Sequence, residues 1–227
     1  MKRGRRIFSG HRLPTSIAAG IAVIVVVVAV IAIADSGSSS SAAKPGSNAR
    51  SGPAAGGVVG TVSSVSKSSF TVSTSAGQKV TVKKASSTTY RKGTSSTSAS
   101  AIAKGEPVLV LGTASGPAIM ATQVIVQPAG GGSATFSPSK VIPFKRGAPS
   151  TSKQDGQIPA NYSQGSGTIV SGTTANTATK AALATYPGGV VDRVVKLSNG
   201  EYEVHNIGVN WPHHIFVNKS FKVVGAN

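Results

Sequence analysis

The sequence predicts a multi-domain, β-rich chain: an N-terminal transmembrane helix, a small antiparallel β-barrel or sandwich, and then a small α+β module, joined by disordered linkers. Three observations predict this fold class. A long uncharged apolar stretch lies near the N-terminus, two later regions alternate in polarity as strands do, and Ser/Gly/Pro-rich segments separate them. With only 1 Trp, 4 Tyr and 6 Phe in 227 residues, little bulk is present to fill one large core.

The N-terminal segment predicts the compartment. Residues 13–34 carry no charge and end in the run IAAGIAVIVVVVAVIAIA. Twenty-two helical residues span roughly 33 Å, enough to cross the hydrocarbon core of a bilayer. Five cations in residues 1–12 indicate a basic cytoplasmic tail, so the rest of the chain would face outward from a bacterial cytoplasmic membrane as a single-pass protein.

A cleaved signal peptide is the alternative interpretation of the same segment. Ala32-Ile33-Ala34 has the small-x-small pattern of a signal-peptidase site, and cleavage after Ala34 would leave a secreted protein. The apolar run is longer than the roughly 7–15 residues typical of signal peptides, which favours the anchor. Both interpretations place the rest of the chain outside the cytoplasm.

Residues 35–57 are rich in Ser, Gly, Ala and Pro and predict a flexible linker. Residues 58–128 predict an all-β domain. SFTVST and QKVTVK alternate polar and apolar residues, with Ser75-Ala76-Gly77 as a hairpin turn between them. PVLVLG is a continuous apolar run suited to a strand buried on both faces, and MATQVIVQ supplies another strand, which together favour a small antiparallel barrel or sandwich.

These motifs carry a resemblance. The segments GTVSSVSKSSFTVSTSAGQKVTV, KGEPVLVLG and IMATQVIVQP resemble short all-β extracytoplasmic bacterial domains with the elements G-x-V-x-x-V, a hairpin, K-G-D-x-V-x-V-x-G and a closing A-x-x-I strand. Glu106 stands where those domains often have Asp. The resemblance implies an OB-like barrel and brings no established activity with it.

Residues 129–166 are of low complexity and predict a second linker, in which Val141-Ile142-Pro143-Phe144 is a candidate docking motif.

Residues 167–227 predict an α+β module. ANTATKAALATY places apolar residues on a helical stripe, and Thr174 or Thr177 can cap its start. Asn199-Gly200 between two strand-like runs is a strong hairpin signal, of the kind found in type I′ turns.

The C-terminal module resembles the PepSY domain family. The pattern is a helix ending in A-x-x-x-x-P-G-G, then V-x-x-V-x-x-x-x-G-x-Y-E-V-H, then a pair of strands. The matching residues are Ala182, Pro187, Gly188, Gly189, Val191, Val194, Gly200, Tyr202, Glu203, Val204, His205, Val217, Phe221 and Val223. PepSY domains occur in propeptides of secreted metallopeptidases and in envelope proteins, so the resemblance implies contact with, or restraint of, a peptidase or other envelope protein.

The segment from Glu201 to Asn218 holds three of the four histidines. Strand alternation predicts that Glu201, Glu203 and His205 face outward, away from Tyr202 and Val204. His213 and His214 are adjacent, so in an extended chain they would point to opposite faces. A zinc or copper site built from His205, Glu203 and one of these two histidines stays open, but H-x₇-H-H matches no metal signature, and no metal or cofactor is expected.

Catalytic motifs are missing from the sequence. There is no G-x-S-x-G elbow, no H-E-x-x-H and no phosphate-binding loop, and the absence of Cys excludes thiol chemistry, so we expect no enzyme. Trp211, between Asn210 and Pro212, is the one Trp; it is either an anchor for a partner or a lid over the small helix.

Two classes of function follow. The first is a membrane-anchored extracytoplasmic binding or regulatory protein, whose predicted partner-binding residues are Glu201, Glu203, His205, Asn210, Trp211 and Pro212. The second is an envelope structural protein that binds anionic polymer or lipid, through Lys79, Lys83, Lys84, Arg91 and Lys92. Net charge is +17, yet no dense basic helix and no stacking face is evident, so nucleic acid is not expected as a partner.

Overall fold

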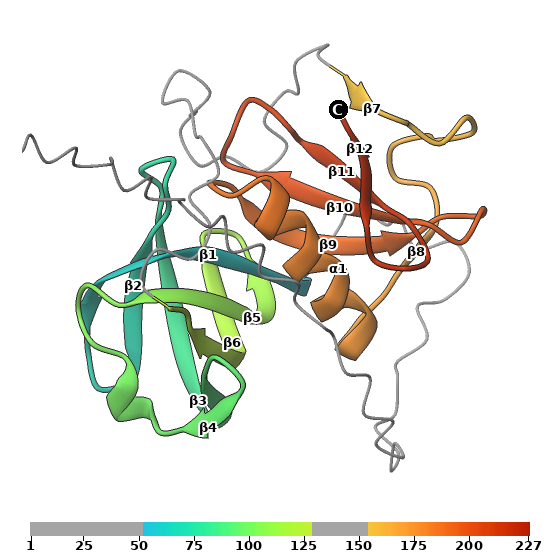
Figure 1. The fold of residues 1–227 in the computed structure, drawn as a ribbon. Helices are drawn as coiled ribbons and strands as arrows, with labels where there is room; N and C mark the ends of the chain where they lie inside the picture. Colours follow the sequence, from blue (N-terminus) through green and yellow to red (C-terminus); the bar gives the residue numbers. More distant parts are fainter. Residues whose placement is uncertain (1–51, 129–153) are drawn as a thin grey trace, which may run out of the picture. The chain divides into compact units, whose positions relative to one another are not determined.

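The structure, a computed structural model, describes residues 52–128 and 154–227 (Figure 1). The first range contains the strands β1 (Ala54–Val65), β2 (Ser69–Ser73), β3 (Lys79–Lys92), β4 (Ser95–Thr97), β5 (Pro107–Ser115) and β6 (Ala118–Val126), with a 3-10 turn at Ala99–Ala101. The second contains β7 (Asp155–Gly156), β8 (Thr168–Ile169), α1 (Gly172–Thr185), β9 (Val190–Lys196), β10 (Tyr202–Ile207), β11 (His214–Val217) and β12 (Val223–Ala226).

Five strands of the first range close into a barrel, in the order β2-β3-β6-β5-β1 with β1 also paired to β2. The expected alternation is confirmed: Phe70 and Val72 on β2, and Val80 and Val82 on β3, point inward and are at most 1% exposed. The barrel is not wholly antiparallel, however, because β3 and β6 run parallel. A parallel pair needs a long crossover connection, and the chain between these two strands, which contains β5, supplies it.

In the second range, α1 packs on one face of an antiparallel sheet formed by β9, β10, β11 and β12 (Figure 1). The predicted helical stripe is confirmed, since Ala175, Ala178, Ala182 and Leu183 are buried against this sheet. The helix begins after Ser171, and no side-chain hydrogen bond caps it. Thr177 instead donates its hydroxyl to the carbonyl oxygen of Thr173, one turn earlier.

The two hairpin turns follow one pattern. Gly77 and Gly200 both have positive φ, and each donates its N–H to the carbonyl oxygen three residues earlier, Thr74 and Leu197 respectively. The loop after β9 is not the expected type I′ turn, which would require a positive φ at Asn199 as well. The Asn199 side chain instead accepts a hydrogen bond from the Glu201 N–H, which fixes a longer loop.

A single sheet path joins both ranges, because β1 pairs with β9 through Gly57↔Val191 and Val58↔Val190. The approach is close: a Cβ at Gly56 would lie 2.0 Å from the Val191 carbonyl oxygen, so only glycine fits. The predicted fold class of separate domains joined by disordered linkers is therefore wrong. Periodicity describes each strand locally and carries no information on pairing between distant strands.

The stretch at residues 154–166, which the sequence placed in a disordered linker, is ordered against the sheet. β7 pairs with β12, and Ile158 and Tyr162 pack on Phe216 and Val195. Residues 129–153, including the candidate docking motif Val141–Phe144, lie outside the described residues.

Within residues 52–128 and 154–227, no helix is long and apolar enough to cross a membrane. The expected tail at 1–12, the anchor at 13–34 with its alternative cleavage site, and all but the end of the 35–57 linker lie outside the described residues.

Candidate functional site

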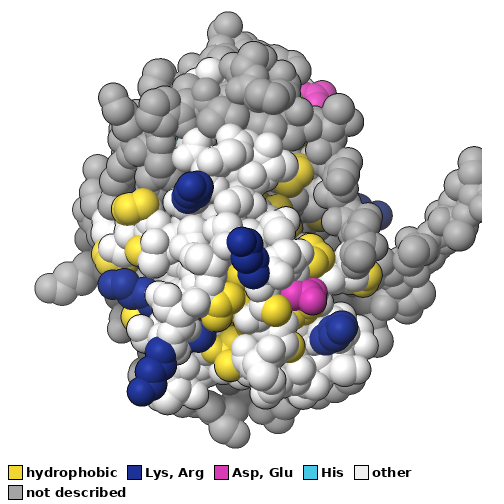
Figure 2. Space-filling model, turned by 90° about the vertical axis from the view of Figure 1, so that its left-hand side faces the viewer, with side chains coloured by type: hydrophobic (Ala, Val, Ile, Leu, Met, Phe, Trp, Pro, Cys, Tyr) yellow, Lys and Arg dark blue, Asp and Glu magenta, His cyan; other side chains and the backbone are white. Residues whose placement is uncertain are grey.

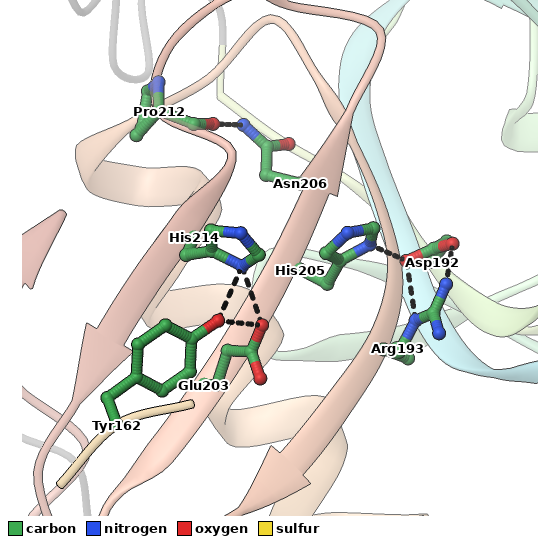
Figure 3. Close-up of polar contacts among 8 residues, drawn as sticks. All are labelled: Tyr162, Asp192, Arg193, Glu203, His205, Asn206, Pro212 and His214. Atoms are coloured by element: carbon green, nitrogen blue, oxygen red, sulfur yellow. Dashed lines mark hydrogen bonds and ion pairs between the residues drawn. The ribbon is translucent and has the colours of Figure 1, made fainter. Parts of the chain in front are cut away.

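The polar residues of the C-terminal sheet gather on the face opposite α1 (Figure 3). His205 on β10 lies opposite His214 on β11 and opposite Arg193 on β9, and strand partners place their side chains on the same face. Glu203, two residues before His205, shares that face. The alternation predicted for EYEVH is therefore confirmed, with Val204 on the α1 side.

The same face is buried, which the sequence did not predict. Glu203 is 3% and His205 6% exposed, so the expectation that they face solvent is wrong. Residues 154–166, which we call the covering segment, lie over them through Tyr162. The Tyr162 hydroxyl donates to Glu203 Oε1 at 2.9 Å and lies 3.0 Å from His214 Nδ1 (Figure 3). Low-complexity sequence gave no sign of this covering segment.

Two imidazole–carboxylate pairs form within this face. His205 Nδ1 lies 2.5 Å from Asp192 Oδ1, and His214 Nδ1 lies 2.6 Å from Glu203 Oε1. Arg193 donates to both oxygens of Asp192, at 3.2 and 2.9 Å. A bulge opposite His205 makes this possible, because an irregularity in the β9–β10 register lets two consecutive residues of β9 reach one site.

His213 joins the cluster from outside the strand. It lies in a bend just before β11, so the strand alternation that would separate it from His214 does not apply, and the expected divergence of the two rings is wrong. Its ring centroid lies 4.4 Å from that of His205 and 4.8 Å from that of His214. The backbone N–H groups of His213 and His214 both donate to the Asn227 carbonyl oxygen, which holds the bend. We call His205, His213 and His214 the histidine cluster.

The histidine cluster shifts two pKa values strongly. Burial raises the pKa of Asp192, but hydrogen bonds and positive charge from His205 and Arg193 outweigh this and lower it to about 2. Burial lowers the pKa of His213 to about 3, helped by the positive charges of His205, His214 and Arg193 against the single attraction of Asp192. His213 is therefore a neutral imidazole at physiological pH.

In the two described ranges, no group of three His, Asp or Glu side chains is arranged to hold a metal ion. Both carboxylates already bind an imidazole, and the rings are closed off from solvent. The histidine cluster is enclosed, since His205, His213 and His214 are all buried.

The remaining predicted partner-binding residues do not form one exposed surface. Trp211 is 7% exposed and packs edge-on against Tyr186, with ring centroids 5.3 Å apart, as expected for a lid. Pro212 is buried, and its carbonyl oxygen accepts from the Asn206 side chain at 3.0 Å. Asn210 and Glu201 are half-buried. Whether these residues bind a partner stays a prediction.

The basic residues of the barrel are accessible. Lys79, Lys83 and Lys92 are exposed, and Lys84 and Arg91 are half-buried. Lys84 Nζ donates to the Ser66 carbonyl oxygen at 2.7 Å. Figure 2 shows Lys and Arg side chains spread over one face, with few acidic groups among them.

Sequence reasoning missed three basic residues. It singled out neither Lys67 nor Lys104, both exposed, and it did not consider Lys180 of α1. Partial burial, and then the charge of Arg91, lowers the pKa of Lys180. Lys67 and Lys104 were visible in the sequence; the effect of Arg91 on Lys180 needed the fold.

No family model, curated protein or solved structure matches the chain.

Proposed function

We propose that the chain is a non-catalytic extracytoplasmic binding protein, tethered to the membrane by residues 13–34, whose barrel binds an anionic polymer. One observation carries this proposal: residues 52–128 hold seven Lys and Arg and one acidic residue, Glu106, and most of these cations are exposed. The basic residues are Lys67, Lys79, Lys83, Lys84, Arg91, Lys92 and Lys104.

The β2–β3 face of the barrel is the best-placed contact surface. Lys79 and Lys83 alternate with inward-facing valines on β3, so both project outward about 13 Å apart, at roughly 3.3 Å per residue. Each lies opposite a serine of β2, since Ser73 pairs with Lys79 and Ser69 pairs with Lys83. Ammonium and hydroxyl groups in two rows suit the repeated anionic groups of a polymer, and attraction of this kind is weakened by salt.

The fold supports two further parts of the proposal. A closed five-stranded barrel supports the OB-like resemblance. OB barrels bind oligonucleotides and oligosaccharides on the face of their second and third strands, which is the face proposed here as the contact surface. One helix on an antiparallel sheet supports the PepSY resemblance, which makes peptidase or envelope-protein contact the second candidate function. The second candidate ranks lower, because Glu203, His205 and Trp211, which were to supply its contact surface, are buried.

Binding of the full-length chain to polyphosphate, in nonionic detergent, tests the proposal. Replacing Lys79 and Lys83 together by Gln should weaken binding several-fold, and raising the salt from 50 to 500 mM should weaken wild-type binding further. The matched control replaces two exposed lysines outside the barrel, Lys219 and Lys222. Binding that is insensitive to salt, or lost equally in the control pair, would overturn the proposal. Binding to phosphatidylglycerol vesicles but not to polyphosphate would replace the polymer with a lipid surface.

A further inference from the structure

The histidine cluster has an asymmetry in its counter-ions. His205 has Asp192, and His214 has Glu203 together with the Tyr162 hydroxyl (Figure 3). His213 has neither a carboxylate nor a hydroxyl bound to its Nδ1, which is buried without a hydrogen-bond partner. The residue is 2% exposed. A proton on either of the first two rings is neutralised by a carboxylate in contact. A proton on His213 is not.

The charged groups around His213 come from each packed element. β9 contributes Asp192 and Arg193, β10 contributes Glu203 and His205, β11 contributes His214, and the covering segment contributes the Tyr162 hydroxyl. Both carboxylates are already bound to other groups, Asp192 to Arg193 and His205, and Glu203 to His214. An imidazolium at His213 would therefore lie in a buried site with no carboxylate in contact, and the packed arrangement disfavours it.

His213 ends the loop of residues 208–213, which contains Trp211. This loop is held by an isolated bridge at Val209 and by a few hydrogen bonds near its end: the Asn206 N–H donates to the His213 carbonyl oxygen, the Asn206 side chain donates to that of Pro212, and the His213 N–H donates to that of Asn227. At the other end, Gly208 has a positive φ and accepts a hydrogen bond from the Gln78 side chain. Strands β10 and β11 keep their own pairing from Tyr202 to His205, so the loop can leave without unfolding the sheet.

We propose that His213 is a proton sensor that keeps the loop of residues 208–213 packed at neutral pH and releases it in acid, exposing Trp211. This goes beyond the proposed polymer binding and does not depend on it. Released, His213 titrates near its ordinary pKa of 6.5; packed, its pKa is about 3. Between these values each unit fall in pH raises the ratio of released to packed loop about tenfold.

The chain carries its own reporter, since Trp211 is its single Trp. Full-length protein in nonionic detergent is titrated from pH 7.5 to pH 4 while Trp emission and far-UV circular dichroism are recorded together. The expected result is a red shift of the emission at a pH where the strand signal is unchanged. The His213→Gln variant should lose this shift, and the control His11→Gln, at the one histidine outside the described residues, should keep it.

Emission that stays constant until the strand signal is lost would overturn the proposal, as would a shift retained in His213→Gln. If that variant does not fold, the wild type decides the question. Hydrogen exchange at the His213 amide, which the packed loop bonds to the Asn227 carbonyl oxygen, should then quicken about tenfold per pH unit relative to the amides of β10, after correction for intrinsic rates. An imidazole NMR signal of His213 that titrates near pH 6.5 with the loop still packed would refute it.

Discussion

Replacing Asp192 by Asn removes the buried charge that His205 and Arg193 share. Folding lowers the pKa of Asp192 from 3.8 to about 2. A depressed carboxyl pKa means that its contribution is fully present above the unfolded value and is lost as the pH falls through the folded value. At neutral pH that contribution is about 2 kcal/mol, and by pH 3 about half of it is gone.

The variant also breaks the buried ion pair between Asp192 and Arg193, and breaking a buried pair in this way costs about 3–5 kcal/mol. We therefore expect Asp192→Asn to lower the free energy of unfolding by about 2–5 kcal/mol at pH 7, and by about 1 kcal/mol less at pH 3. Urea unfolding of the full-length protein, followed by far-UV circular dichroism at both pH values, measures the difference. Glu106→Gln in the barrel is the control. A loss at pH 7 no larger than that of the control, or a difference that grows in acid, would refute the role given to Asp192.

Three smaller changes test other parts of the fold, each by urea unfolding. Gly56→Ala should cost about 1–3 kcal/mol, because its Cβ meets the Val191 carbonyl oxygen; an unchanged midpoint would contradict the β1–β9 junction. Tyr162→Phe should cost about 1 kcal/mol by removing the hydroxyl bound to Glu203, and no loss would mean the covering segment is held otherwise. Phe216→Ala should cost about 3–5 kcal/mol, since Phe216 is fully buried; a loss under 1 kcal/mol would contradict its core position.

The strands and the helix could be predicted because their signals are local. Phe70, Val72, Val80 and Val82 alternate in the sequence and alternate in the barrel, and the alanines of α1 repeat at helical spacing. The pairing of β1 with β9 could not be predicted, because it joins strands far apart in the sequence through backbone groups and small residues, which leave no periodic pattern in the sequence.

The candidate site was half predictable. The alternation of EYEVH placed Glu203 and His205 on one face. The expected two-residue turn at Asn199-Gly200 would have placed Val194 opposite His205, and it is the longer loop of the structure that places Arg193 there. Burial of that face depends on Tyr162, which comes from a segment too polar to predict as packed. The position of the His213 ring beside His214 could not be predicted, because a bend lies just before β11 and the alternation of side chains holds only within a strand.

The junction between β1 and β9 also has a consequence for the order of folding. All five strands that close the barrel lie in residues 54–126, so they are synthesised, and can pair, before β9 exists. Until β9 arrives, the backbone groups of β1 at Gly57 and Val58 form an open edge that accepts any extended strand. A β9 from a second copy satisfies that edge as well as the chain's own does, and the exchange becomes more frequent as protein concentration rises. Refolding from denaturant should therefore give more exchanged dimer at high concentration than at low.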